Sequence, residues 1–121
     1  EVRRQRQMCI RDSNYSDFEK VDIRVGTVIE AKLNKKSSNP SLYLIIDFGE
    51  KIGKKKTSAQ LIKYYLPEEL IGKQVAAVIN FPPKQIGKMI SEVLVLGFPD
   101  DENNPVLVMP SIKIPNGGKL F

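Results

Sequence analysis

Residues 21–31 read VDIRVGTVIEA, and the organisation of the chain follows from this stretch. Apolar or β-branched residues recur at every second position from Ile23 to Ala31, which predicts a long strand with one buried face. Gly26 is on the other face of that strand. A glycine inside a strand is typical of a sharp coil or of a close approach by another segment. We therefore expect a long, half-buried strand with a special geometry at Gly26.

Short strands are also expected further along the chain, separated by glycine and proline at Gly49, Pro82-Pro83 and Gly97. Residues 80–91 and 100–104 are polar or mixed stretches and are expected to be loops. Five or more short strands with little helix predict a small all-β barrel or sandwich. The expected strands are residues 42–48, 57–59, 74–80, 91–96 and 106–109.

Two short helical turns are predicted from their capping residues. Ser16 and Glu19 have capping-box spacing, with Ser16 as the N-cap. In the second turn Pro67 is expected at the first helical position, two glutamates follow it, and Gly72 ends the turn.

The first thirteen residues, EVRRQRQMCIRDS, follow no structural pattern. They contain no apolar run of the length that a targeting peptide needs, although a basic nucleic-acid arm is physically possible. Codons that encode residues 3–13 match one reading frame of a transposase-type sequencing-library adapter over all eleven residues. We therefore expect residues 1–13 to be a non-native, disordered segment and residues 16–121 to form one domain.

Charge and composition narrow the possible functions. The whole chain has a net charge of +5, which falls to +3 without residues 1–13, so the domain is mildly basic. The chain contains no histidine, and its one cysteine, Cys9, lies in the excluded segment. Histidine acid–base chemistry, thiol nucleophiles and Cys/His zinc sites are thereby excluded from the domain. No apolar run approaches membrane-spanning length, so no membrane insertion and a cytoplasmic location are expected.

Two short motifs resemble enzyme signatures without satisfying them. Residues 49–58 have three residues between their glycines, where a phosphate-binding P-loop needs four. Asp47-Phe48-Gly49 matches a kinase metal motif, but none of the other kinase motifs is present. We expect a binding protein with no catalytic residues, no cofactor and no metal.

Two stretches are candidate binding surfaces. Residues 54–56 are three consecutive lysines, which either bind an anionic partner or form a solvated hairpin tip. Residues 80–91 combine apolar side chains with two lysines, a pattern that suits base stacking, phosphate contacts, an apolar peptide or ordinary packing against the core.

Several motifs together resemble the tRNA-binding-domain family, in particular its CsaA-like, stand-alone branch. They are Asp17 to Gly26, Ser58-Ala59-Gln60, Asn80-Phe81-Pro82-Pro83, Ser91 to Gly97, and Pro115 to Lys119. The resemblance implies a five-stranded OB-fold barrel with short helical turns, a C-terminal strand extension and a symmetric homodimer. It implies binding to the outside of tRNA by shape, or, as in the CsaA-like branch, an export-related chaperone that binds unfolded preproteins.

The two possible functions use different residues. We expect RNA to contact Lys35, Lys36, Lys84, Lys88 and Ser91. We expect an unfolded preprotein to contact Phe81, Ile86 and Met89. Leu94 stands where several tRNA-binding relatives carry methionine.

The C-terminal part of the chain is rich in apolar residues for a segment of a small domain. Because a domain of this size buries a modest core, we expect a symmetric homodimer that keeps these residues from being left exposed, and the sequence does not say which of them cross the dyad. They are residues 106–109, Ile112, Ile114 and Phe121.

Overall fold

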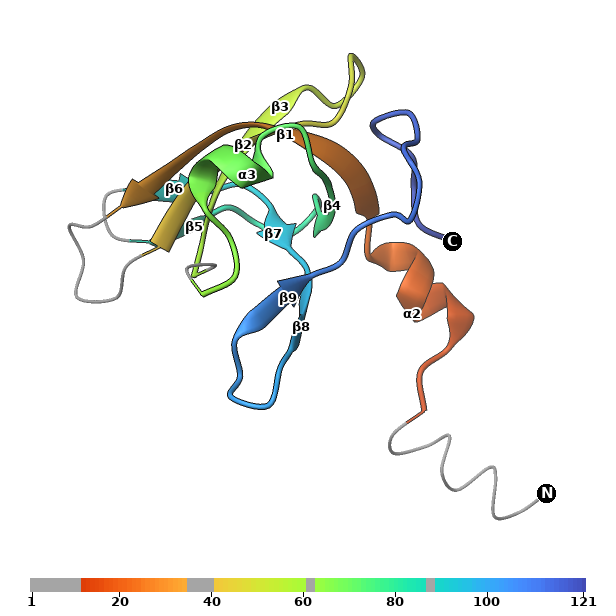
Figure 1. Ribbon diagram of the computed structural model, residues 1–121. Coiled ribbons are helices and arrows are strands. Elements are labelled where there is room, and N and C mark those ends of the chain that lie inside the picture. The colour runs from red at the N-terminus through yellow and green to blue at the C-terminus, as the bar shows by residue number, and fades with distance from the viewer. Residues whose placement is uncertain (1–11, 35–40, 61–62, 87–88) are drawn as a thin grey trace.

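The computed structural model describes residues 12–34, 41–60, 63–86 and 89–121 (Figure 1). Two short helices and nine strands occur in these ranges. They are α2 (Tyr15–Lys20), β1 (Ile23–Asn34), β2 (Ser41–Asp47), β3 (Lys54–Ala59), α3 (Pro67–Leu70), β4 (Gln74–Val78), β5 (Lys84–Ile86), β6 (Met89–Ser91), β7 (Leu94–Val95), β8 (Gly97–Pro99) and β9 (Pro105–Leu107). Most of the predicted non-native segment lies outside the described residues, and the division at residue 13 stays a prediction.

The central feature is a curled, antiparallel sheet of five strands in the order β3-β2-β1-β4-β7. Strand β1 pairs with β4 over its first half and with β2 from Thr27 onward. Two small hairpins, β5–β6 and β8–β9, extend from this sheet. The all-β, OB-like prediction is confirmed. The expected loop at residues 80–91 is partly wrong, because β5 and β6 form a hairpin there.

The faces of β1 differ from the prediction. Val28 is fully buried and Ile29 is exposed, so the inner face of β1 begins with Gly26 and Val28 in place of the predicted Thr27 and Ile29. The register to β2 shifts between Val28 and Glu30, and the residue inserted by this bulge brings Ala31 to the buried face. Gly26 lies on the inner face with Val28, and a Cβ atom at Gly26 would come 2.6 Å from Cγ2 of Ile46. The predicted close approach at Gly26 is therefore confirmed, and the predicted face is wrong.

The core fills the inside of the curled sheet. Strand β2 contributes alternate residues, and β4 and β7 supply the opposite wall. Helix α3 covers one end by inserting Leu70, which is buried. The largest fully buried apolar side chains are Val28, Leu42, Leu44, Ile46, Phe48, Leu70 and Val75.

The helix caps confirm one prediction and correct the other. Helix α3 has Pro67 at its start and acids in its first turn, as expected, and Gly72 after it has a φ of 91°. Helix α2 begins earlier than expected, with Asn14 as its N-cap. The backbone N–H of Asn14 donates to the Asp17 carboxylate at 3.0 Å, so Asp17 has the role that we predicted for Glu19.

The C-terminal segment packs along the first half of β1. The N–H of Gly117 donates to the Val25 carbonyl at 2.8 Å, and the N–H of Leu120 donates to the Ile23 carbonyl at 2.8 Å. Gln74 anchors the same segment, because its side-chain amide donates to the Ile114 carbonyl at 2.6 Å. This segment buries Val25 on the outer face of the sheet.

Replacing Gly26 with alanine should destabilise the domain. The new methyl group would meet the buried side chains of Ile46 and Phe48, which have no room to move. Overpacking of this kind raises the free energy of the folded state by about 1–3 kcal/mol. Thermal or urea unfolding measures the change. The matched control is Gly118→Ala, whose methyl group would lie 3.8 Å from Val25 and should leave stability nearly unchanged. Equal stability of the two variants would contradict the packing seen at Gly26.

Candidate functional site

The two ends of the sheet meet at a seam between β3 and the chain that leads into β7. The N–H of Glu92 donates to the Lys56 carbonyl at 2.9 Å. The N–H of Lys56 donates to the Glu92 side-chain carboxylate at 3.1 Å. One backbone bond and one side-chain bond therefore close the barrel at this point.

Thr57 continues this closure inside the barrel, where its side chain is 1% exposed. Its hydroxyl lies 2.7 Å from the Ser91 hydroxyl and donates to the Val93 carbonyl at 2.8 Å. The Ser91 hydroxyl is 3.0 Å from the same carbonyl. These contacts give Ser91 partners within the seam. Its predicted contact with RNA stays a prediction.

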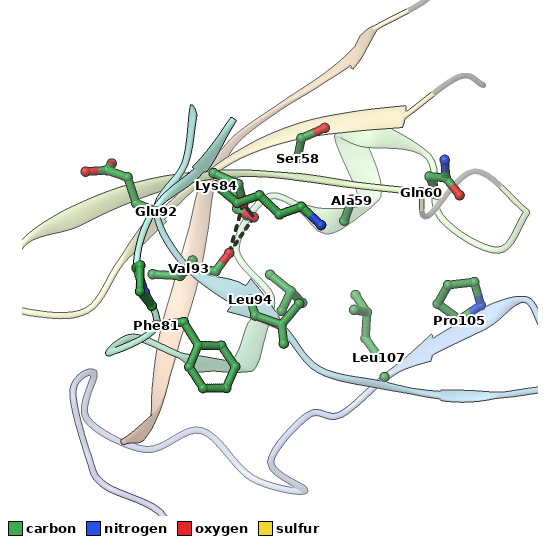
Figure 2. Close-up of a pocket in the computed structure, with 15 residues that line it drawn as sticks. Ser58, Ala59, Gln60, Phe81, Lys84, Glu92, Val93, Leu94, Pro105 and Leu107 are labelled. Carbon is green, nitrogen blue, oxygen red and sulfur yellow. Dashed lines mark hydrogen bonds between the residues drawn. The ribbon is translucent and has the colours of Figure 1, made fainter. Parts of the chain in front are cut away.

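Next to the seam is an open groove of about 530 Å³ (Figure 2). One wall is the end of β3 and the residue after it, and the other comes from β7, β8 and β9. Phe81 and Leu94 expose about half of their surface, 46% and 50%, and Val93 and Leu107 are buried beneath. The groove is mostly apolar, and it is lined by Thr57, Ser58, Ala59, Gln60, Phe81, Pro82, Lys84, Ser91, Glu92, Val93, Leu94, Val95, Gly97, Pro105 and Leu107.

The structure brings together three of the predicted site residues, Phe81, Lys84 and Ser91, at this groove. Met89 is half-buried in β6 and does not line it. Lys35, Lys36 and Lys88 lie outside the described residues, as does the side chain of Ile86.

Lys84 lines the groove, and the three lysines of β3 directly precede the part of that strand that lines it; we call these four residues the lysine rim. The three lysines of β3 and Lys84 of β5 form no ion pair with any described residue. Figure 2 shows the Lys84 amino group extending over the groove, while the Glu92 carboxylate points away from it. Lys56 was predicted only as part of the lysine run at residues 54–56, and Leu107, which lines the groove, was not predicted as a site residue. Strand alternation within residues 54–59 could have indicated that Lys56 points away from the core.

Two adjacent tyrosines hold the β8–β9 hairpin that forms one wall. The Leu107 N–H donates to the Tyr65 hydroxyl at 2.8 Å. The Tyr64 hydroxyl donates to the Asp100 carboxylate, which also accepts the backbone N–H of Asn104 at 2.7 Å. The Tyr64 bond is the main cause that lowers the pKa of Asp100 below its usual range, and the same bond raises the pKa of Tyr64.

A family model described as "Putative tRNA binding domain" matches residues 23–119, which include the whole barrel and the groove. The chain belongs to the tRNA-binding-domain family. The resemblance predicted from the sequence is confirmed.

Solved structures and curated relatives agree with this assignment. The chaperone CsaA from Bacillus anthracis str. Ames is 45% identical, with a TM-score of 0.86 over 91% of this chain and 99% of that one. A CsaA chaperone protein from Picrophilus torridus is also 45% identical, with a TM-score of 0.82 over 91% of this chain and 100% of its own. A methionine–tRNA ligase from Porphyromonas gingivalis is 35% identical over 109 residues, 90% of this chain and 16% of the ligase. The chain thus spans about a sixth of the length of that relative.

Two kinds of feature are absent from the described residues. None of their helices is long and apolar enough to cross a membrane. Within the same ranges, no three acidic, histidine or cysteine side chains gather as a metal site would require.

Acid unfolding should depend on the Tyr64–Asp100 bond. A carboxyl group with a lowered pKa stabilises the fold above its unfolded pKa of about 4, and this contribution is lost as the pH falls toward the folded pKa. Tyr64→Phe removes the main cause of the shift, so its melting temperature should fall less between about pH 4 and pH 2 than that of the wild type. Melting curves by circular dichroism measure this difference. Tyr15→Phe in α2 is the control and should keep the wild-type acid dependence; a Tyr64→Phe variant that did so as well would contradict the assignment.

Proposed function

We propose that this domain binds tRNA, with the lysines of β3 and β5 contacting its phosphate backbone. The observation that carries the proposal is the family match over residues 23–119, which spans the seam and its lysine rim. Lys54, Lys55, Lys56 and Lys84 support it, because no described carboxylate neutralises them. A partner inside the cell such as tRNA implies a cytoplasmic location.

Recognition would depend on shape and charge. Lysine ammonium groups neutralise phosphates and position a nucleic acid without reading its sequence. Structured RNA is recognised largely through its shape and backbone. This mode of binding needs no catalytic group, and we infer that the domain is a binding module and not an enzyme.

The salt dependence of binding tests the role of the rim. Each phosphate contact that is lost should lower the slope of log affinity against log salt by about 0.7–0.9. Lys56→Ala combined with Lys84→Ala should therefore reduce the slope by about 1.5. Fluorescence anisotropy with labelled unfractionated tRNA over a series of KCl concentrations measures it.

The matched control for this experiment is Lys113→Ala, an exposed lysine of the C-terminal segment outside the rim. This variant should keep the wild-type slope. The proposal would be refuted by tRNA binding with no salt dependence, or by an equal change in slope at Lys113.

A second candidate function is a chaperone that binds unfolded polypeptides, including preproteins of the export machinery. The apolar groove favours it, because Phe81 and Leu94 are half exposed above buried apolar residues. The 45% identity to two structures named as CsaA chaperones supports it as well. Binding through apolar contacts would depend little on salt and would show a negative heat-capacity change.

We also propose that the domain forms a symmetric homodimer through its C-terminal surface. A shallow apolar hollow of about 400 Å³ lies there, lined by Ile23, Met109, Ile114 and Phe121 among others. Phe121 is fully exposed and Ile112 is largely exposed in one copy of the chain, which is unusual for large apolar residues.

The proposed dimer can be tested by one charge placed in the hollow. Met109→Glu should shift the protein to a monomer at micromolar concentration, because a carboxylate buried between two apolar surfaces is unfavourable. Sedimentation velocity measures the state of each variant. Ile71→Glu, at an exposed apolar residue outside the hollow, should leave the wild-type dimer intact. A wild type that sediments as a monomer would exclude this interface.

A further inference from the structure

One edge of β3 is available for pairing at the groove. The N–H and C=O groups of Lys56 both bond to Glu92, so they point away from β2 and toward the seam. In a strand, the backbone groups of residues two positions apart point to the same edge. The N–H and C=O of Ser58, which pairs in register with Tyr43 of β2, therefore point into the groove.

No group in the described part of the chain bonds to the backbone N–H or C=O of Ser58. Two residues earlier on the same edge of β3, the carbonyl of Lys56 already accepts a hydrogen bond from the Glu92 N–H. Unpaired strand edges are places where another extended chain can add by backbone hydrogen bonds. The barrel is thus closed at Lys56 and open at Ser58.

The shape and chemistry of the groove match an extended polypeptide. Successive side chains of a strand point to opposite faces, so a chain paired with Ser58 would direct alternate side chains onto the apolar floor at Leu107 and Val93. Lys84 extends over the groove and offers a positive charge to the outer side of that chain.

A nucleic acid matches the groove less well. Single-stranded RNA binds to proteins by stacking its bases on several aromatic rings. Among the described residues that line the groove, Phe81 alone is aromatic. Ser58 also presents a donor and an acceptor on one residue, which is the pairing pattern of a peptide backbone.

We propose that an unfolded polypeptide segment adds to β3 at Ser58 as an extra strand, with apolar residues at alternate positions and an acidic residue near Lys84. This inference rests on the second candidate function, the binding of unfolded polypeptides. It adds the mode of binding and the class of sequence that the groove selects.

Proline at Ser58 tests the strand pairing directly. Ser58→Pro removes the N–H that faces the groove and leaves the ladder to β2, and proline is tolerated at such an edge position. The matched control, Ser58→Ala, keeps this N–H and loses only the hydroxyl that donates to Ser41 at 3.2 Å. The probe is reduced, carboxymethylated α-lactalbumin, which stays unfolded. Loss of a backbone bond together with the clash of the proline ring should weaken its binding about tenfold relative to Ser58→Ala. The affinity for unfractionated tRNA should be equal in the two variants.

Amide hydrogen exchange in the wild-type protein gives a second measurement that does not depend on the folding of the proline variant. In ¹⁵N-labelled protein, a saturating amount of the probe should slow the exchange of the Ser58 amide. If the probe does not bind the wild type at all, the chaperone function fails and this inference fails with it. If the probe binds while the Ser58 amide stays unprotected, strand addition is overturned and the chaperone function stands. Protection of Ser58 by tRNA in place of the probe would identify the groove as an RNA site and would overturn the inference.

Discussion

A curled sheet becomes a barrel only where its first and last strands meet, and here they meet at Lys56-Thr57 and Glu92-Val93. The Thr57 hydroxyl is buried. A buried hydroxyl without a hydrogen-bond partner destabilises the folded state by about 1–3 kcal/mol. The Val93 carbonyl and the Ser91 hydroxyl satisfy it. This short closure determines where the seam opens and therefore where the groove begins.

The two candidate functions share one residue of the lysine rim, Lys84. Lys84 lines the groove and also belongs to the group of lysines that no described carboxylate neutralises. A bound polypeptide with an acidic residue near Lys84 would remove one positive charge from the surface that we propose for RNA binding. The two ligands would therefore compete even if their contacts overlapped at one residue only, and the competition would weaken as salt screens the charge.

Sequence patterns predicted the elements well and the faces of the elements less well. The strands at residues 42–48 and 74–80 and the turn at Pro67 follow from local periodicity and capping, and local interactions decide them. The bulge at Ile29 cannot be read from β1 alone, because it arises from the register with β2. Two of the candidate site residues, Phe81 and Lys84, come from a stretch whose mixed character is visible in the sequence. The floor of the groove at Leu107 could not be predicted in this way, because only the folded chain brings Leu107 close to Ser58.

The pairing of the C-terminal segment with β1 also affects how the protein is made. The Arg24 guanidinium donates to the carbonyl of Gly117, which is 93 residues later in the chain. At ordinary rates of translation, β1 leaves the ribosome roughly 5 to 20 s before its partner leaves it. During this interval the first half of β1 has one unpaired edge, and Val25 is uncovered. The nascent domain is thus itself an unfinished polypeptide with an exposed strand, and its folding is completed only after nearly the whole domain has emerged.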